Sequence, residues 1–431
     1  MIVKLLLDKK REGRELARAE IAELIAAYTR GDVPDYQMAA FAMAVCCQGM
    51  SAAETLALTE SMRDSGTCLS WPGLASADKH STGGVGDKLS LIIQPLAAAC
   101  GLAVPSLTGR GLGLTGGTAD KMESIPGYVA GLSLVDYRRV VESCGCSLTV
   151  QTGEIAPADK KLYALRDVTG TVPSIPLIVA SILSKKLAEG AETLVFDVKC
   201  GAGAFMKTRA DAVALAQALV AGAKGAGRKS CALVTAMDEP LGFAVGNANE
   251  VQESLDILAG RSRAADCRDL SIEFAARMVA LAKGIPVDAA RGQCVANLEN
   301  GEAARRFMRM VELHGGDLAA FETSRAQGAV VQEVVAADEG FVASIDANGI
   351  AQAAFELGAG RAKSSDAIDP VAGVELAVTH GDRVVKGQVL AKVVTATRPE
   401  RLAGAAAEVV KAVRFSSVAP AARELILEEI V

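Results

Sequence analysis

Apolar residues recur every three or four positions along residues 1–67, the spacing that places them on one face of an α-helix. One such stripe covers residues 21–28 and ends before the helix-breaking segment 31–34. A second run follows, and Ser51 with Glu54 has the pattern of a capping box that opens a third helix. The pattern predicts a small N-terminal domain of antiparallel helices over residues 1–67.

The pattern changes near residue 68, after which short apolar runs alternate with amphipathic stretches up to residue 335. Short bounded apolar runs are typical of buried strands, and we expect strands at residues 91–93, 102–104, 148–150, 193–197 and 231–235. Their alternation with helices predicts an α/β domain over 68–335 with a central mixed sheet. The run 176–189 is expected to leave this sheet, so that helices from about 157–190 join the N-terminal helices.

Residues 336–431 show a third pattern, in which apolar and polar positions alternate as in half-exposed strands, notably over 340–346 and 384–394. The stretch 380–390 resembles the turn and hairpin of lipoyl- or biotinyl-type sandwiches, without their carrier lysine motif. We therefore expect a structural C-terminal α+β module of barrel-sandwich character. The predicted fold class is α/β, with a small helical domain, a large α/β domain and this module.

Composition narrows the function classes. The chain has 431 residues, 50% of them apolar, so it can bury a large core. Its net charge of −6, without a basic stripe, argues against nucleic acid as a partner. No apolar run reaches the roughly 20 residues of a membrane span, and the start does not resemble a signal peptide, so we expect a cytoplasmic protein without a membrane partner. The ten cysteines and three histidines lack metal-site spacing, which predicts reduced thiols.

Lys79, His80 and Ser81 stand side by side directly before the glycine-rich run 83–86. Glycine backbone lets N–H groups converge on an anion, and the lysine and the hydroxyl add charge and hydrogen bonds. A histidine within such a nest can act on a group attached next to the anion. The combination predicts chemistry on a phosphate-containing complex.

A second glycine-rich segment, 111–116, formally matches the dinucleotide-binding motif. The acidic residue expected about 20 positions later would be Asp136, which stands where a helix begins. The segment is also flanked by Thr108, Arg110 and Thr118, more polar groups than a backbone-bound pyrophosphate needs. Dinucleotide binding is therefore disfavoured.

Longer motifs resemble those of the thymidine and pyrimidine-nucleoside phosphorylases. The run 106–126 is very similar to the signature of this family, and the resemblance continues through residues 78–87, 156–169, 184–190, 197–206, 240–247 and 357–362. It spans nearly the whole chain. It implies a homodimer that needs no cofactor. The implied reaction is reversible phosphorolysis of pyrimidine nucleosides (thymidine, deoxyuridine or uridine), with inorganic phosphate as co-substrate, to the free base and a pentose 1-phosphate.

The resemblance also assigns residues to the two substrates. The phosphate-binding positions are matched by Lys79, Ser81, Ser90, Thr108 and Thr118. The nucleoside-binding positions are matched by His80, Leu112, Tyr163, Arg166, Ser181 and Lys185. Because the leaving pyrimidine departs with negative charge, cationic donors aimed at the base stabilise the transition state more than the ground state. The expected catalytic residues are therefore His80, facing O2 of the base, with Arg166 and Lys185.

Two positions depart from the family pattern. Leu114 stands where histidine is usual, which removes a polar group near the expected site. Lys88 stands where broad-specificity relatives have a hydroxyl that helps to bind a monovalent cation, and the other ligands there match Gly86, Leu241, Ala244 and Glu253. We expect the Lys88 ammonium group to replace that potassium ion, so that no metal binds. The alternative is that Lys88 turns to solvent and potassium still binds.

Two other functions stay open. An anthranilate-type phosphoribosyltransferase would share the helical-plus-α/β plan, but it would use magnesium and a substrate bearing pyrophosphate. A non-catalytic nucleoside-binding protein would have lost groups from the phosphate or base positions. The sequence leaves open the preference between thymidine and uridine and the physiological direction of the reaction.

Overall fold

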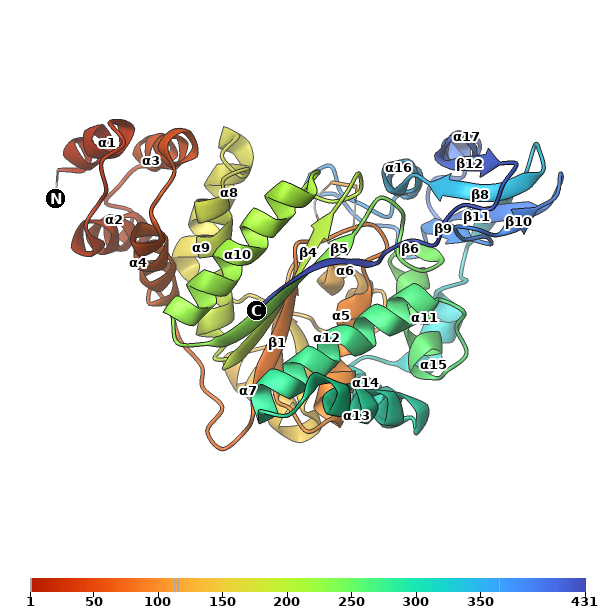
Figure 1. Cartoon of the computed structure of the whole chain (residues 1–431), viewed down its shortest axis with the longest axis horizontal. Coiled ribbons are helices and arrows are strands. Elements are labelled where there is room, and N and C mark those ends of the chain that lie inside the picture. Colours follow the sequence, from red (N-terminus) through yellow and green to blue (C-terminus); the bar gives the residue numbers. More distant parts are fainter. Residues whose placement is uncertain (1, 112, 115, 364) are drawn as a thin grey trace.

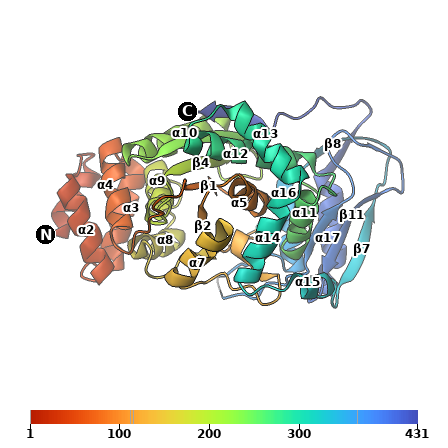
Figure 2. The same ribbon diagram turned by 90° about the horizontal axis from the view of Figure 1, so that it is seen from below.

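The computed structural model describes residues 2–111, 113, 114, 116–363 and 365–431. The N-terminal helices lie at one end of the molecule, a sheet covered by helices lies in the middle, and a smaller module of strands and helices lies at the other end (Figures 1 and 2). Among the described residues, none of the helices combines the length and apolar character that a membrane crossing requires. All ten cysteines carry free thiols, and seven of them are buried.

The N-terminal region is helical, as predicted. Its helices are α1 (Val3–Arg11), α2 (Arg18–Arg30), α3 (Asp35–Gln48) and α4 (Ala52–Arg63). The capping box forms, because Ser51 Oγ accepts a hydrogen bond from Glu54 N and the Glu54 carboxylate accepts one from Ser51 N. Lys10 Nζ lies 2.9 Å from both oxygens of the same carboxylate and ties α1 to α4. Two later helices, α8 (Pro157–Thr169) and α9 (Ile175–Ala188), share the apolar core of this bundle.

The central sheet has the strand order β1-β4-β5-β13. Its strands are β1 (Ala77–Ser81), β4 (Thr193–Cys200), β5 (Lys229–Ala236) and β13 (Ile426–Ile430). The first three are parallel and β13 is antiparallel to β5, so the predicted mixed sheet is confirmed. A second parallel pair, β2 (Val104–Thr108) and β3 (Cys146–Val150), adjoins β1 through a bridge between Ser76 and Ala103. All residues of β4 are buried, as expected for a parallel strand covered on both faces.

Helices cover both faces of this sheet. α9 and α10 share a core with β4 and β5 on one face, and α5 and α12 pack on the other. The helices of this domain are α5 (Leu89–Ala99), α6 (Thr118–Glu123), α7 (Leu134–Cys144), α10 (Arg209–Gly225), α11 (Ala248–Leu258), α12 (Ala265–Lys283), α13 (Val287–Glu299), α14 (Glu302–Leu313) and α15 (Leu318–Ser324).

The C-terminal module contains two small antiparallel sheets, β6-β9-β11-β7 and β10-β8-β12. Its elements are β7 (Val330–Val335), β8 (Gly340–Ile345), α16 (Ala347–Leu357), β9 (Gly373–Leu376), β10 (Arg383–Val384), β11 (Val389–Thr395), the 3₁₀ turn η1 (Pro399–Arg401), α17 (Leu402–Ala412) and β12 (Val413–Ser416). The α/β domain lends β6 (Ala244–Gly246) to this module, and the chain then returns to the central sheet as β13 (Figure 1). This exchange of strands fastens the module to the α/β domain.

One predicted strand is wrong. Residues 91–93 lie inside α5, whose residues from Leu89 to Ala98 are buried except Ser90. A helix that is apolar all round gives the same short apolar run as a buried strand, so periodicity cannot separate the two. The strand expected at 102–104 begins at Val104. The strands expected at 148–150, 193–197 and 231–235 are present.

Candidate active site

A cleft of about 420 Å³ opens between the carboxyl ends of β1 and β2 and the helices α8 and α9. The pairs β1–β4, β4–β5 and β2–β3 are parallel, so their strands end at the same edge of the sheet. Ligands bind at this edge in open α/β sheets. The cleft brings together seven of the residues assigned to the substrates from the sequence: His80, Ser81, Thr108, Tyr163, Arg166, Ser181 and Lys185. Lys79, Ser90 and Thr118 are not among its described lining residues. Leu112 lies outside the described residues.

One wall of the cleft is a face of α8. Asp159, Tyr163 and Arg166 follow one another at spacings of four and three residues, so they lie on the same side of the helix. Arg166 donates hydrogen bonds from Nε, Nη1 and Nη2 to the backbone carbonyls of Thr171, Leu177 and Val172, at 2.9–3.2 Å. These bonds fix the guanidinium group at the joint between α8 and α9. Burial lowers the pKa of Arg166 from its usual value.

The adjoining wall is a face of α9, where Ser181 and Lys185 are one helical turn apart. Lys185 Nζ donates to Asp159 Oδ2 at 2.5 Å, to Ser181 O at 2.5 Å and to Ser181 Oγ at 3.0 Å. The carboxylate of Asp159 thus joins α8 to α9 and holds the ammonium group at the cleft. Sequence reasoning missed Asp159, although its four-residue spacing before Tyr163 was a usable signal.

The end of α9 is anchored to the sheet by a buried charge cluster. Lys186 Nζ pairs with the carboxylate of Asp78 on β1 and lies 3.1 Å from Glu189 Oε2. Burial and the neighbouring Asp78 raise the pKa of Glu189 well above its usual value. Lys186 thus joins two acidic groups, one on β1 and one at the end of α9. The cluster therefore sets the position of Lys185 relative to His80.

β1 presents Lys79 and His80 to opposite faces, because side chains alternate along a strand. His80 lines the cleft. Burial lowers its pKa well below the usual value, and the ammonium groups of Lys186, Lys185 and Lys79 act in the same direction. The imidazole is therefore neutral near pH 7 in the free protein. A neutral imidazole can donate a hydrogen bond from its N–H group to a carbonyl oxygen.

On the other face of β1, charges gather in a dry environment. Lys79 Nζ lies 3.1 Å from Asp197 Oδ2, and Lys199 Nζ lies 2.8 Å from the same atom. Both ammonium groups are buried, and they share this single carboxylate oxygen. Ser81 Oγ donates to Asp87 Oδ2 at 2.5 Å. Although burial opposes it, Lys79 and Lys199 lower the pKa of Asp87 from its usual value.

The hydroxyl groups assigned to phosphate lie where strands give way to helices. Ser81 and Thr108 end β1 and β2, Ser90 lies in the first turn of α5, and Thr118 is the first residue of α6. Helix N-termini carry unpaired N–H groups and a partial positive charge, which favour anions.

The cleft also has an apolar lining that sequence reasoning missed. It includes Phe205 on the loop between β4 and α10, and Val172, Ile178 and Ile182 next to α9 or on it. Ile178 and Ile182 are spaced like Ser181 and Lys185, so the face of α9 was detectable. Phe205 follows a strand within a glycine-rich loop and gave no periodic signal. These side chains provide an apolar wall for a flat heterocycle.

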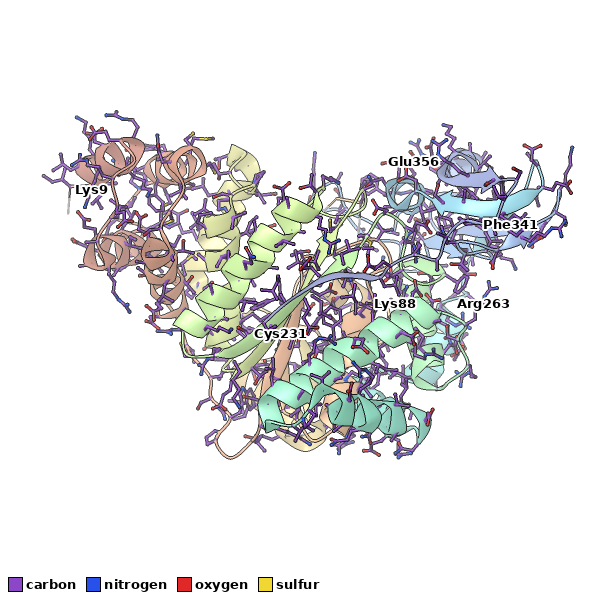
Figure 3. The ribbon with its side chains drawn as sticks, viewed as in Figure 1. Lys9, Lys88, Cys231, Arg263, Phe341 and Glu356 are labelled. Carbon is purple, nitrogen blue, oxygen red and sulfur yellow. The ribbon has the colours of Figure 1, made fainter. Side chains whose placement is uncertain are left out.

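Lys88 lies in the interior of the molecule (Figure 3). Its Nζ donates to Leu241 O at 2.8 Å and lies 2.9 Å from Glu253 Oε2. Glu253 also accepts hydrogen bonds from the backbone N–H groups of Phe243 and Ala244. Although burial opposes it, the charge of Glu253 raises the pKa of Lys88. A side chain at Gly86 would place its Cβ 2.5 Å from Leu241 O, so glycine is required for this close approach.

Three family models match the chain. The helical bundle domain of a glycosyl transferase family matches residues 4–66, and the a/b domain of that family matches residues 74–304. The C-terminal domain of pyrimidine nucleoside phosphorylase matches residues 341–416.

Known proteins resemble the chain over most of its length. The thymidine phosphorylase of Mesorhizobium japonicum is 45% identical over 437 residues, which cover 100% of this chain and 99% of that protein. The thymidine phosphorylase of Agrobacterium fabrum is 48% identical over 90% of each chain. The pyrimidine-nucleoside phosphorylase of Geobacillus stearothermophilus is 43% identical over 89% of this chain and 90% of its own. The crystal structure of anthranilate phosphoribosyltransferase from Thermus thermophilus has a TM-score of 0.59 at 18% identity, over 72% of this chain and 98% of that one, which shows a shared fold.

Proposed function

The chain belongs to the family of thymidine and pyrimidine-nucleoside phosphorylases, and on this premise we propose that it catalyses the reversible phosphorolysis of pyrimidine nucleosides. Thymidine, deoxyuridine and uridine are the candidate substrates, and the products are the free base and a pentose 1-phosphate. The observation that carries the proposal is the cleft. It faces His80 and Lys185 toward one space, and the neighbouring Lys79 forms a buried cluster with Lys199 and Asp197.

Phosphate is the expected occupant of the glycine-rich side of the cleft. Its binding groups are the hydroxyls of Ser81, Ser90, Thr108 and Thr118, and the ammonium group of Lys79 supplies opposite charge. Positioning phosphate beneath C1′ of the sugar turns a bimolecular encounter into an intramolecular attack. No metal ion or organic cofactor enters this scheme.

The reaction breaks the C1′–N1 bond and forms a bond between C1′ and a phosphate oxygen. The electron pair of the broken bond leaves with the base, while the sugar becomes oxocarbenium-like. Neutral His80 donates a hydrogen bond to O2 of the base, and Lys185 and Arg166 offer positive charge to the departing ring. These contacts strengthen as charge develops, so they lower the barrier rather than merely tightening substrate binding. Because Lys185 and Lys79 belong to different parts of the fold, closure of the cleft completes the site.

The decisive assay follows base release from uridine, thymidine and deoxyuridine side by side, with and without phosphate. We expect release that requires phosphate and yields one pentose 1-phosphate per base. An anthranilate-type transferase would instead consume anthranilate and phosphoribosyl pyrophosphate with magnesium. Base binding without turnover would support the non-catalytic alternative. Either of those results, without phosphate-dependent release from any nucleoside, would overturn the proposal.

The protein is also proposed to act as a homodimer through α1 and α3. Leu5, Tyr36 and Met43 on these helices are large apolar side chains that are exposed to solvent. A groove of about 450 Å³ between the helices is lined by Lys4 and Arg11 as well as Asp8 and Met43, so a two-fold contact could pair opposite charges across an apolar centre. Light scattering should give twice the chain mass, and Met43→Asp should give the monomer.

The buried free thiols suit a reducing compartment, and we propose a cytoplasmic location.

We propose that Lys88 takes the place of a potassium ion at the position matched by Gly86, Leu241, Ala244 and Glu253. The ammonium group of Lys88 donates to the Leu241 carbonyl and pairs with Glu253, which uses the oxygens that a cation would need. It carries the same charge as potassium. We therefore propose that phosphorolysis by this protein is independent of monovalent cations.

A further inference from the structure

The loop between β2 and α6, residues 109–117, is closed by one buried carboxylate. Asp120 Oδ2 accepts hydrogen bonds from Gly111 N at 2.6 Å and from Gly117 N at 3.0 Å, so it joins the two ends of the loop. The Asp120 side chain is 1% exposed. Thr108 and Thr118, which flank the loop, are both proposed phosphate ligands. The conformation of the loop therefore sets the spacing of two phosphate-binding hydroxyls.

The C-terminal module reaches this loop directly through the segment 358–361, which follows α16. Arg361 Nη1 donates to Asp120 Oδ1 at 2.7 Å, and Arg361 O accepts a hydrogen bond from Gly113 N at 2.8 Å. A Cβ at Gly360 would lie 2.5 Å from Gly113 O, so only glycine allows the two segments to approach so closely. The segment and the loop are thus joined by an isolated antiparallel bridge between Gly113 and Arg361.

Charge makes this contact relevant to phosphate. An unpaired carboxylate beside the loop would repel a phosphate dianion. Arg110 also approaches Asp120, at 3.6 Å, but its guanidinium group is half exposed and is held mainly by Glu123. The side chain of Arg361 is only 14% exposed, and its Nε is held by Asp366 O at 3.1 Å. Arg361 is therefore the fixed, partly desolvated partner of Asp120, and such pairs are stronger than exposed ones.

We propose that Arg361 is a positioning residue for phosphate. It orients loop 109–117 and compensates the charge of Asp120, so the C-terminal module contributes to phosphate affinity without touching the substrate. This inference rests on the proposed phosphorolysis. The module thereby gains a functional role in addition to its structural one.

The test compares Arg361→Ala with Arg361→Lys and with a matched control, Arg263→Ala. Arg263 also links the α/β domain to the C-terminal module, by donating to Ala377 O at 2.9 Å, and it lies on the outer surface of the protein (Figure 3). Removal of a charge-assisted hydrogen bond predicts that Arg361→Ala raises the KM for phosphate about 10- to 100-fold. The KM for the nucleoside should change less than about twofold. Arg361→Lys should recover part of the phosphate affinity, and Arg263→Ala should behave like the wild type.

A double-mutant cycle with Asp120→Asn tests the path of the effect. If Arg361 acts through Asp120, the Arg361→Ala/Asp120→Asn variant should resemble one of the single variants. Independent, multiplicative effects would overturn the inference. An equal rise of both KM values together with a lower Tm in Arg361→Ala would also overturn it, because that is the signature of a purely structural contact.

A readout without turnover separates this inference from the proposed function. Amide hydrogen exchange in residues 109–117 should be faster in Arg361→Ala than in the wild type or in Arg263→Ala, with no substrate present. Unchanged exchange there would overturn the inference even if the enzyme is active. Faster exchange in a protein that lacks phosphate-dependent base release would support the role of Arg361 in orienting the loop and would overturn the proposed function.

Discussion

The two sides of the cleft are built differently. On the side proposed for phosphate, the side chains of Lys79 and Lys199 do not line the cleft but are fully buried beside it and share Asp197, and strand ends and helix starts converge on the same edge of the sheet. On the side proposed for the base, Tyr163 on α8 is 47% exposed, and Phe205 on the loop between β4 and α10 is 46% exposed. In the proposed reaction, phosphate is common to all candidate substrates, whereas the base and the sugar differ between thymidine, deoxyuridine and uridine. A rigid, desolvated site suits the constant substrate, and an open apolar wall suits the variable one.

The two sides of the cleft also differ in the partners of their charged side chains. Buried ion pairs on the phosphate side are costly to break, because the remaining partner stays buried without compensation. On the base side, Arg166 is held by neutral backbone carbonyls and Lys185 by one carboxylate, so positive charge remains for the substrate. Variants should therefore damage stability and phosphate affinity on one side, and turnover on the other.

The largest effect is expected for Lys88→Thr, which removes the buried ion pair with Glu253. It leaves Glu253 buried without its ion pair, so we expect a loss of about 3–5 kcal/mol of unfolding free energy in buffer without sodium or potassium. Potassium should recover part of this loss in the variant, because the new hydroxyl completes a set of oxygen ligands. Denaturant unfolding with potassium or with choline chloride measures both effects.

The control for Lys88→Thr is Lys9→Thr, which removes a surface ion pair with Glu20 near the N-terminus (Figure 3). It should cost less than about 1 kcal/mol and show no response to potassium. The wild-type enzyme should be equally active with and without potassium. Strong activation of the wild type by potassium would show that Lys88 does not replace the ion.

On the base side, Lys185→Ala should lower kcat by about 10²- to 10³-fold, the usual loss when one donor to a developing anion is removed. The phosphate KM should change little. Steady-state kinetics and the Tm measure this, with Lys161→Ala as the control on α8, because its ammonium group bonds to Tyr28 O. Near-normal kcat/KM in Lys185→Ala would remove this residue from the mechanism.

On the side proposed for phosphate, Lys79→Met should change the KM for phosphate, whereas Lys185→Ala changes kcat. We expect the KM for phosphate to rise about 10- to 100-fold, with little change for the nucleoside, because one charged donor to the anion is lost. Lys199 and Thr235 still hold Asp197, so the protein should fold. The control is Lys229→Met, which removes an exposed lysine at the start of β5. Equal effects on both substrates would contradict the division of the cleft.

Most residues of the candidate site were assigned by the family resemblance. The residue pattern alone indicated only the run 79–81 beside a glycine-rich backbone. In the structure, four-residue spacing places Ser181 and Lys185 on one helix face, and Ser81 and Thr108 end two strands at the cleft. The roles of these residues toward substrate stay predictions.

Contacts between distant segments could not be predicted in this way. Asp159 meets Lys185 across 26 positions and Asp120 meets Arg361 across 241, and no local period encodes either pairing. The return of the chain to the central sheet as β13 is likewise decided by tertiary packing. The buried helix at 91–93 was mistaken for a strand because both conformations bury the same apolar residues.

His80 lies at the boundary between the two sides, so its titration reports on both. Burial and three lysines lower its pKa in the free protein. Bound phosphate offsets the lysine charges, so phosphate should raise the pKa of His80. NMR titration of the histidine ring signals measures this, with His80→Gln to assign the signal. His314, which burial shifts to a pKa of about 4 beside Tyr128, is the internal control and should not respond. A His80 pKa that phosphate leaves unchanged would place the imidazole away from the anion.

The smallest effect is expected at Leu114, on the loop that joins the two sides. Its side chain is 36% exposed, so an imidazole at this position can extend toward solvent. Leu114→His should leave the Tm unchanged and raise kcat/KM, or shift the ratio between thymidine and uridine, by less than about fivefold, which corresponds to under 1 kcal/mol. Leu114→Phe, with a ring but no hydrogen-bonding group, should not reproduce the change. Identical profiles for all three proteins would place residue 114 outside the working site. A gain confined to histidine would show that residue 114 contributes a polar contact to the working site.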